Sequence, residues 1–160
     1  MPYPEMMVAP MRQDLVRIGF KELKTPADVD AVLGTERRTT LLAVNSVCGC
    51  AAGMMRPAVY LSLQGEHKPE VLTTVFAGQD MAATDRAREY IAGYPPSSPS
   101  VALFKDGELV YFMERHRIEG RYPEEMLGRS RFPRIGELPY LLTLGPRGFF
   151  WFQLKQEEDE

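Results

Sequence analysis

The sequence contains few of the residues from which many kinds of functional site are built. Its 160 residues include only two cysteines and two histidines, and the formal net charge at pH 7 is −3. Because the tail Glu157–Glu160 supplies four of the acids, the rest of the chain is close to neutral. This balance provides no basic stripe of the kind that binds nucleic acid. We interpret Arg12, Arg17, Lys21 and Lys24 as part of a solvated face.

Long apolar runs are absent as well. No stretch approaches the roughly 20 apolar residues that a membrane-spanning helix needs, and the opening Met1–Glu5 lacks the basic and then apolar pattern of a secretory signal. We therefore expect no membrane partner and a cytoplasmic location. Structural disulfides are rare in that compartment. The two cysteines, which share the tripeptide 48–50, are thus expected to be redox-active or metal-binding.

The first three quarters of the chain alternate helical and strand patterns. Helices are predicted at 10–18, 25–34, 51–63 and 80–91 and from Pro123 to Pro133, and strands at 39–44, 71–76, 101–104 and 109–113. Thr25-Pro26-Ala27-Asp28 has the pattern of a capping box, and Asp80 is expected to cap its helix. Asp106-Gly107 is a strong signal for a two-residue hairpin turn. This order predicts an α/β fold with three layers, α/β/α, around a mixed central sheet.

The last part of the chain has a different composition. The apolar segments 138–144 and 149–154 flank a Gly-Pro-Arg-Gly sequence, which predicts a hairpin. The apolar surface of that hairpin is too large to be left exposed to water. We therefore expect it to pack either on its own domain or against a second copy in a homodimer. We divide the chain into a domain at 1–132 and a C-terminal extension at 133–160, made of this apolar hairpin and the acidic tail.

The Cys48-Gly49-Cys50 segment stands between an apolar strand and a helix. A thiol attacks as its thiolate, and the free N–H groups and dipole of a helix N-terminus favour negative charge there. We therefore expect Cys48 at the start of the helix, more exposed than Cys50 and with a lowered pKa. Gly49 lets the two sulfurs approach each other. A bridge across one residue would be strained and easily opened.

Two other interpretations of the cysteine pair remain open. Two sulfurs are too few for a closed zinc site, and only His67 and His116 could add ligands, so we expect no metal. Free cysteines also pack as inert small hydrophobes. The alternative to an enzyme is therefore a non-catalytic module of the same fold that binds a metal or a protein partner.

Several neighbours of the cysteines are candidate support residues. Asn45 and Ser46 precede the pair and could either hydrogen-bond a thiolate or cap the helix. Arg56 could add positive potential, but a long surface side chain usually contributes little. Pro57 is expected to kink the helix. For Ser98-Pro99, just before a buried strand, we expect a cis peptide bond in a loop that lies beside the cysteines and pairs with an extended substrate.

Motifs along most of the chain resemble the bacilliredoxin family, in unbroken order from about Pro10 to Leu127. The motifs that carry the resemblance are Asn45–Gly53 with Arg56-Pro57-Ala58, Val75–Asp80, Pro96–Ser100 and Arg115–Gly120. After about Leu127 the chain departs from the family, whose members usually finish with one amphipathic helix.

The resemblance implies a thioredoxin-like fold and a thiol–disulfide oxidoreductase with no bound cofactor. Its activity would be the removal of bacillithiol or a similar small thiol from mixed disulfides of client proteins, with weak disulfide isomerase activity. The resemblance also implies that Cys48 is the attacking thiol, that Cys50 is the candidate resolving thiol, and that Pro99 is the thioredoxin-type cis-proline.

Overall fold

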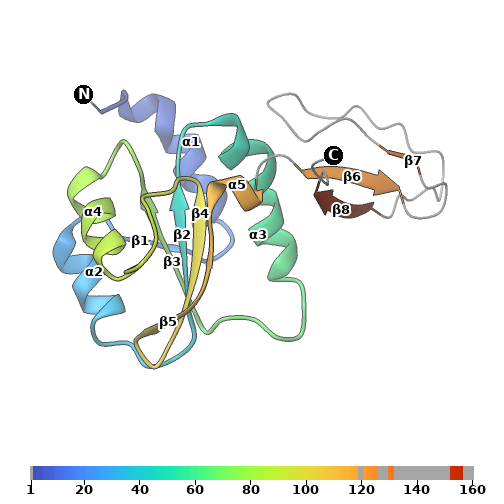
Figure 1. Ribbon diagram of the computed structural model, residues 1–160. Helices are drawn as coiled ribbons and strands as arrows, with labels where there is room; N and C mark the ends of the chain where they lie inside the picture. Colours follow the sequence, from blue (N-terminus) through green and yellow to red (C-terminus); the bar gives the residue numbers. More distant parts are fainter. Residues whose placement is uncertain (1, 119–120, 126–129, 132–151, 157–160) are drawn as a thin grey trace.

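A mixed five-stranded sheet forms the centre of the protein (Figure 1). The computed structural model describes residues 2–118, 121–125, 130–131 and 152–156. In order across the sheet, the strands are β1 (Lys21–Glu22), β3 (Val71–Phe76), β2 (Thr40–Asn45), β4 (Ser100–Lys105) and β5 (Glu108–Met113). The first three run parallel to one another, and β4 and β5 are antiparallel to their neighbours. The sheet is therefore mixed, as the sequence predicts.

Helices cover both faces of this sheet (Figure 1). They are α1 (Glu5–Val16), α2 (Pro26–Leu33), η1 (Ala51–Met55), α3 (Arg56–Ser62), α4 (Met81–Glu89) and the short α5 (Arg115–Ile118). Alternate residues of β2 enter two different cores, since side chains alternate along a strand. Leu42 packs in the core with α2 and α4, whereas Leu41 packs in the core with α1, η1 and α3. The predicted three-layer α/β/α architecture is confirmed.

The predicted capping box at Thr25 and the predicted turn at Asp106-Gly107 are both present. The Thr25 hydroxyl accepts a hydrogen bond from the Asp28 N–H at 3.2 Å, and the Asp28 carboxylate accepts from the Thr25 N–H at 2.9 Å, so the capping box is confirmed. Asp106 and Gly107 both have positive φ, at 56° and 82°. They form the two-residue turn between β4 and β5, because Lys105 pairs with Glu108.

Two helix boundaries differ from the prediction. The first helix begins at Glu5, five residues before the expected start at Pro10. Val8 is buried together with Leu15, so tertiary packing of this face outweighs the backbone hydrogen bond that Pro10 cannot make. The helix expected at 51–63 is a π-helical segment, η1, followed by α3. Pro57 lies in the first turn of α3, directly after η1, so the departure from regular α-helix falls just before the proline. The kink expected at Pro57 stays a prediction.

The helix predicted from Pro123 is wrong. Residues Arg121–Glu125 form strand β6, which pairs antiparallel with β7 (Ser130–Arg131) and β8 (Phe152–Gln156). Arg121 pairs with Gln156, so the partner comes from far along the chain and a local helix-start signal could not reveal it. The predicted hairpin at 138–144 and 149–154 lies mostly outside the described residues. This second sheet joins segments on both sides of residue 132, and the domain boundary there stays a prediction.

Replacing the most buried sheet leucine tests the assignment of the core. Leu42 is fully buried in β2, whereas Leu61 on α3 is 67% exposed. We expect Leu42→Ala to lower the free energy of unfolding by about 3 kcal/mol, because it leaves a cavity in a packed core. Leu61→Ala removes the same atoms from the surface and should change it by less than about 0.5 kcal/mol. Urea denaturation measures both values, and equal losses would contradict this core.

Candidate functional site

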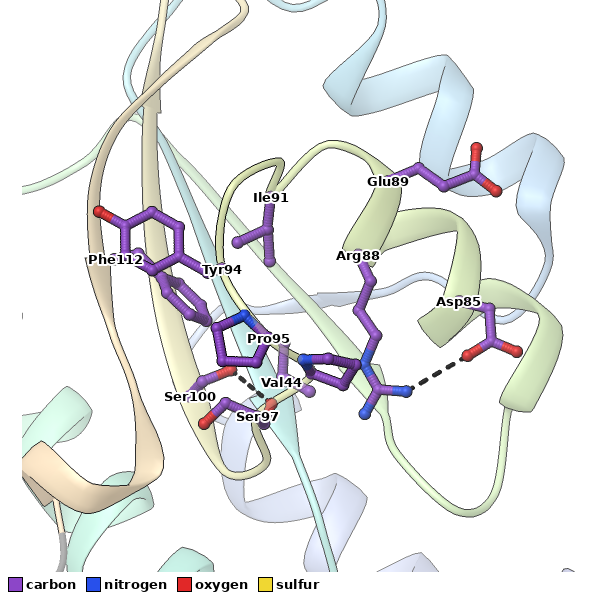
Figure 2. Close-up of a pocket in the computed structure, with 11 residues that line it drawn as sticks. Val44, Asp85, Arg88, Glu89, Ile91, Tyr94, Pro95, Ser97, Ser100 and Phe112 are labelled. Atoms are coloured by element: carbon purple, nitrogen blue, oxygen red, sulfur yellow. Dashed lines mark hydrogen bonds and ion pairs between the residues drawn. The ribbon is translucent and has the colours of Figure 1, made fainter.

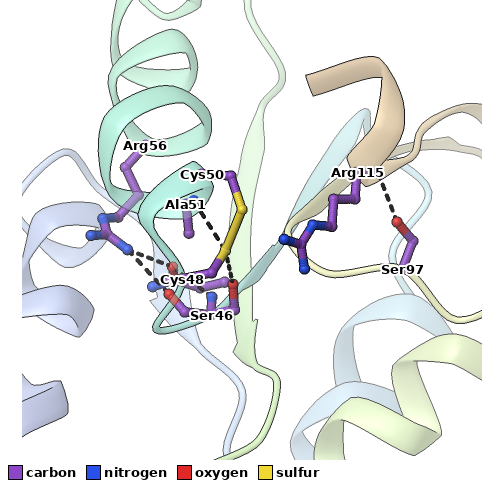
Figure 3. Close-up of a disulfide and its surroundings, with 8 residues drawn as sticks. Ser46, Cys48, Cys50, Ala51, Arg56, Ser97 and Arg115 are labelled. Atoms are coloured by element: carbon purple, nitrogen blue, oxygen red, sulfur yellow. Dashed lines mark hydrogen bonds between the residues drawn. A yellow bond between two sulfur atoms is a disulfide. The ribbon is translucent and has the colours of Figure 1, made fainter. Parts of the chain in front are cut away.

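The two cysteines lie in the connection between β2 and η1. Cys48 and Cys50 are joined by a disulfide, with their Cα atoms 5.4 Å apart (Figure 3). Cys50 is only 7% exposed and belongs to the core that contacts α1, whereas Cys48 is half-buried at the edge of that core. Cys48 is thus the more accessible of the two sulfurs, as expected. An incoming molecule reaches it first.

Two hydrogen-bonding groups contact the sulfur of Cys48. The Ser46 hydroxyl lies 3.2 Å from Cys48 Sγ, and the Ala51 N–H donates to the same sulfur at 3.4 Å (Figure 3). In the reduced protein both groups can donate to a thiolate, which favours the charged form of the sulfur. Ser46 therefore fits the first of the two roles considered for it. The Ala51 N–H, at the start of η1, also donates to the Cys48 carbonyl at 3.1 Å, so it is shared between this carbonyl and the sulfur.

Asn45 supports this segment from beneath without contacting the sulfur. Its side chain is almost fully buried, and its oxygen accepts hydrogen bonds from the Ser46 N–H at 2.9 Å and from Arg56 Nη1 at 3.0 Å. Its amide nitrogen donates to the Met11 carbonyl at 3.1 Å. Asn45 therefore joins the end of β2 to α1 and α3. It neither binds the sulfur nor caps the helix, the two roles considered from the sequence.

Arg56 is buried, so its interpretation as a surface side chain of little effect is wrong. It is 7% exposed, and besides Asn45 it donates to the Ser46 carbonyl at 3.4 Å (Figure 3). Its Nε lies 3.0 Å from Asp14 Oδ2, an ion pair without hydrogen-bond alignment. Burial lowers the pKa of this guanidinium and Asp14 opposes the shift, yet arginine keeps its charge in proteins. A fixed positive charge thus lies behind the segment that carries Cys48.

Arg12 and Asp80 also have roles that the sequence did not indicate. Arg12 is 5% exposed and donates to both oxygens of Asp80, at 2.6 and 3.0 Å, and to Glu22 at 2.9 Å and Glu5 at 3.1 Å. Its guanidinium also lies over the Phe76 ring. Hydrogen bonding to Asp80 raises the pKa of Arg12. Asp80 makes no side-chain cap for α4. The predictions that Arg12 lies on a solvated face and that Asp80 caps its helix are therefore both wrong. Together they tie α1 to the ends of β1 and β3.

The Ser98–Pro99 peptide bond is cis, which confirms that expectation. Val44 of β2 pairs with Ser100 of β4, so the antiparallel register places Pro99 beside Asn45, at the start of the cysteine segment. Pro99 is buried and Ser98 is half-buried. The loop is fixed by a hydrogen bond from the Ser100 hydroxyl to the Ser97 carbonyl at 2.9 Å. The fold therefore brings the cis-proline loop and the cysteine segment together at one end of the central strands β2 and β4.

No role for Arg115 could be inferred from the sequence, although this residue begins one of the motifs that resemble the bacilliredoxin family. Its N–H donates to the Ser97 hydroxyl at 2.7 Å, which joins α5 to the cis-proline loop. Figure 3 shows the Arg115 side chain pointing from α5 toward the disulfide. The neighbouring His116 is exposed, with Nδ1 3.9 Å from the Glu114 carboxylate. The site thus contains an arginine that only the tertiary arrangement reveals.

Two hollows border the cis-proline loop. One cavity of about 290 Å³ lies between this loop, α4 and β5, and Figure 2 shows Ser97 and Ser100 facing it with Tyr94 and Phe112. The rings of Tyr94 and Phe112 are 4.9 Å apart and form its apolar wall. The second hollow is an open cleft of about 400 Å³ between the loop and the start of α5. Ser97 lines both, so this loop is accessible from two sides.

Within the described ranges, no group of three or more His, Cys, Asp or Glu side chains could hold a metal ion. No helix among the described residues is long and apolar enough to cross a membrane.

Comparison with known proteins identifies the family. The Disulphide isomerase family matches residues 3–130. A bacilliredoxin of Salinibacter ruber is 57% identical over 123 residues, which are 76% of this chain and 72% of the relative. Bacilliredoxins of Halalkalibacterium halodurans and Cytophaga hutchinsonii are 52% and 55% identical over 127 and 119 residues, covering 79% and 74% of this chain and 88% and 87% of the relatives.

A second, shorter match covers residues 111–151, which resemble the C-terminal domain of maltogenic amylases. It spans well under half of the chain and does not establish membership of that family. The long match shows where the protein belongs. The chain is a member of the disulphide isomerase family, with bacilliredoxins among its relatives, and its cysteine pair has a thiol–disulfide redox role.

Proposed function

We propose that this protein is a thiol–disulfide oxidoreductase that removes bacillithiol, or a similar small thiol, from mixed disulfides of client proteins. The observation that carries the proposal is the half-buried Cys48 sulfur, contacted by the Ser46 hydroxyl and the Ala51 N–H and bonded to the buried Cys50. A thiolate in such a place is stabilised by two donors and still reached from solvent. The bacilliredoxin names of the relatives support the choice of small thiol.

In the first step, the Cys48 thiolate attacks the small-thiol sulfur of the client mixed disulfide. A disulfide forms between Cys48 and the small thiol, and the client sulfur leaves with the electron pair and takes a proton from solvent. The Ser46 hydroxyl and the Ala51 N–H favour the Cys48 thiolate before attack. The client cysteine has thereby been reduced from the mixed disulfide to a free thiol.

In the second step, Cys50 loses its proton and attacks Cys48 Sγ. The small thiol leaves as its thiolate, and the Cys48–Cys50 disulfide seen in Figure 3 forms. Two electrons and two protons from a reducing thiol or dithiol then regenerate the pair. Because Cys50 is buried beside Cys48, its proposed role is intramolecular resolution and not attack on clients.

The cis-proline loop supplies a place for the client backbone. The half-buried Ser98 and the cis Pro99 lie beside the cysteine segment at the end of β2, and main-chain groups of such a loop can pair with an extended peptide. The same exchange chemistry carried out on a client disulfide would give disulfide isomerase activity. We also propose a thioredoxin-like, cofactor-free mode of action in the cytoplasm, with client proteins and a low-molecular-weight thiol as partners.

Separate replacement of the cysteines tests the two steps. We expect Cys48→Ser to abolish removal of the small thiol from a client mixed disulfide, because the attacking sulfur is gone. Cys50→Ser should still release one equivalent of client thiol and accumulate the small thiol on Cys48. Mass spectrometry of client and enzyme in a single-turnover reaction measures both. Equal loss in the two variants would contradict this division, and full activity of Cys48→Ser would show that Cys48 is not the attacking thiol. Failure of the parent protein to release any client thiol would support the non-catalytic binding module.

The Ser46 contact predicts how thiolate formation responds to mutation. Ser46→Ala removes a donor to the sulfur, and hydrogen bonds to charged groups are worth about 1.5–3 kcal/mol. In the Cys50→Ser background, the midpoint of the curve of Cys48 alkylation rate against pH should therefore move upward by about one pH unit. Ser62→Ala, which removes a hydroxyl bonded to the Val59 carbonyl on α3, should leave the profile in place. An unshifted profile in Ser46→Ala would show that the hydroxyl does not stabilise the thiolate.

A further inference from the structure

A third hollow, not yet described, is an apolar groove between the η1–α3 helix and the elements β4, β5 and α5. Its volume is about 390 Å³, and its apolar lining includes Met54, Met55, Leu61, Val101, Met113 and Ile118. Among its described lining residues the charged side chain is Arg117, whose guanidinium lies 5.8 Å from the centre of the Tyr111 ring. The chemistry of this groove therefore suits uncharged, apolar groups.

Large apolar side chains are exposed on both rims of the groove. Leu61 on α3 is 67% exposed, and Tyr111 on β5 is 43% exposed. Along the helical wall, the exposed Gly53, Pro57 and Leu61 recur at every fourth residue and so follow one stripe of the helix surface. Apolar groups gathered around one hollow differ from single exposed side chains, and such patches mark binding surfaces.

The groove is continuous with the disulfide. Met54 and Ile118 of the groove belong to the same buried core as Cys50, and Cys48 and Val101 pack against that core. Figure 3 shows the disulfide between the start of the cysteine-bearing helix and α5, the two elements that form the near end of the groove. A partner that exchanges a disulfide with Cys48 is held at that sulfur, so its neighbouring groups lie beside the groove.

The length of the groove fits a polypeptide. Gly53, at the near end, follows Cys50 by three residues, and Leu61 follows Gly53 by eight. At about 1.5 Å per helical residue, this wall is about 12 Å long. An extended chain advances about 3.3 Å per residue, so about four client residues cover it. A small thiol attached to Cys48 is too short to do so. A folded second copy would crowd the half-buried Cys48, whereas a flexible chain leaves it open.

The lining of the groove also suits partners of varied sequence. Three of its residues are methionines, whose flexible side chains adapt to different apolar shapes. Val101, on the other wall, follows the cis Pro99 by two residues. One client segment can therefore pair its main chain with the cis-proline loop and place its apolar side chains in the groove.

We propose that this groove binds apolar side chains of the client polypeptide, a few residues from the client cysteine that carries the mixed disulfide. The proposal rests on the proposed function, because it needs exchange at Cys48. It adds the class of client, a flexible chain with leucine-like residues near its cysteine. The reaction is unchanged: the Cys48 thiolate attacks the small-thiol sulfur, and the client thiolate leaves.

Two model clients of equal length test this selection. Each is a flexible peptide with one cysteine that carries 2-mercaptoethanol as a mixed disulfide. One peptide has leucine and the other has glutamine at the third and fifth residues on both sides of the cysteine, positions that share a face in an extended chain. The full-length protein in the Cys50→Ser background is mixed with each peptide. Mass spectrometry follows the adduct on Cys48, and the readout is the ratio of the two second-order rate constants, leucine over glutamine.

We expect the leucine peptide to react about tenfold faster with the parent protein, the factor that about 1.4 kcal/mol of apolar burial gives. Leu61→Gln and Tyr111→Gln should each lower this ratio about threefold, because each removes part of the apolar rim. Tyr60→Gln is the matched control. Tyr60 is 49% exposed and precedes Leu61 on α3 but does not line the groove, so both rates should stay unchanged.

Other outcomes separate the two proposals. Equal rates for the two peptides, or an equal fall of both rates in Leu61→Gln and Tyr111→Gln, would overturn the groove as a client site while leaving exchange at Cys48 intact. A concentration-dependent dimer that light scattering detects in the parent and not in Leu61→Gln would assign the groove to a second copy and also overturn it. So would an unchanged ratio in Leu61→Gln with a lowered free energy of unfolding, which would assign the groove to another part of this chain. Failure of both peptides to form any adduct on Cys48 in the parent would instead contradict the proposed function.

Discussion

The buried side chain of Asn45 is the contact on which the geometry of the cysteine segment depends. It lies at the last residue of β2 and connects three pieces of the fold: the Met11 carbonyl of α1, the guanidinium of Arg56 at the start of α3, and the N–H of Ser46. Without Asn45 the buried Ser46 N–H would lose its hydrogen-bond partner, at a cost of about 1–3 kcal/mol, and Arg56 Nη1 would keep only its longer bond to the Ser46 carbonyl. The direction in which the chain leaves the sheet toward Cys48 is therefore set by satisfying buried polar groups.

A second buried cluster fixes the other end of the same face. Arg12 of α1 binds Asp80, which follows β3, and Glu22, which belongs to β1. The helix α1 is therefore fixed by these ion pairs and, at Met11, by the hydrogen bond from Asn45. Breaking a buried ion pair strands a charge and costs more than the pair itself contributes. These two anchors explain why α1 stays packed against the segment that carries the cysteines. They also explain how a segment rich in small residues keeps one conformation.

What could be predicted from the sequence was the part that local chemistry decides. Strand β3 was predicted at its observed limits, and the capping box at Thr25 and the turn at Asp106 satisfy neighbouring backbone groups. The burial of Arg12 and Arg56 could not be predicted in this way, because it depends on tertiary contacts. Arg12 binds Asp80, 68 residues away, and Arg56 binds Asn45 at the end of β2 and pairs with Asp14 of α1. The position of Arg115 near the disulfide could not be predicted either, because it depends on the antiparallel pairing of β5 with β4.

The order that we propose for the exchange reaction follows from the unequal burial of the two cysteines. Both sulfurs occur in the same tripeptide, and its place between a strand and a helix already predicts that Cys48 is the more exposed of the two. Cys50 turns into the core with Ala51 and Met54, while Cys48 remains at the edge with Ser46 and Ala51 as donors. In the proposed reaction the client disulfide meets the more exposed Cys48, and the 7% exposed Cys50 is shielded from it. The same packing holds Cys50 next to Cys48, as their disulfide shows, so the proposed intermolecular attack and intramolecular release use two sulfurs that the fold buries to different degrees.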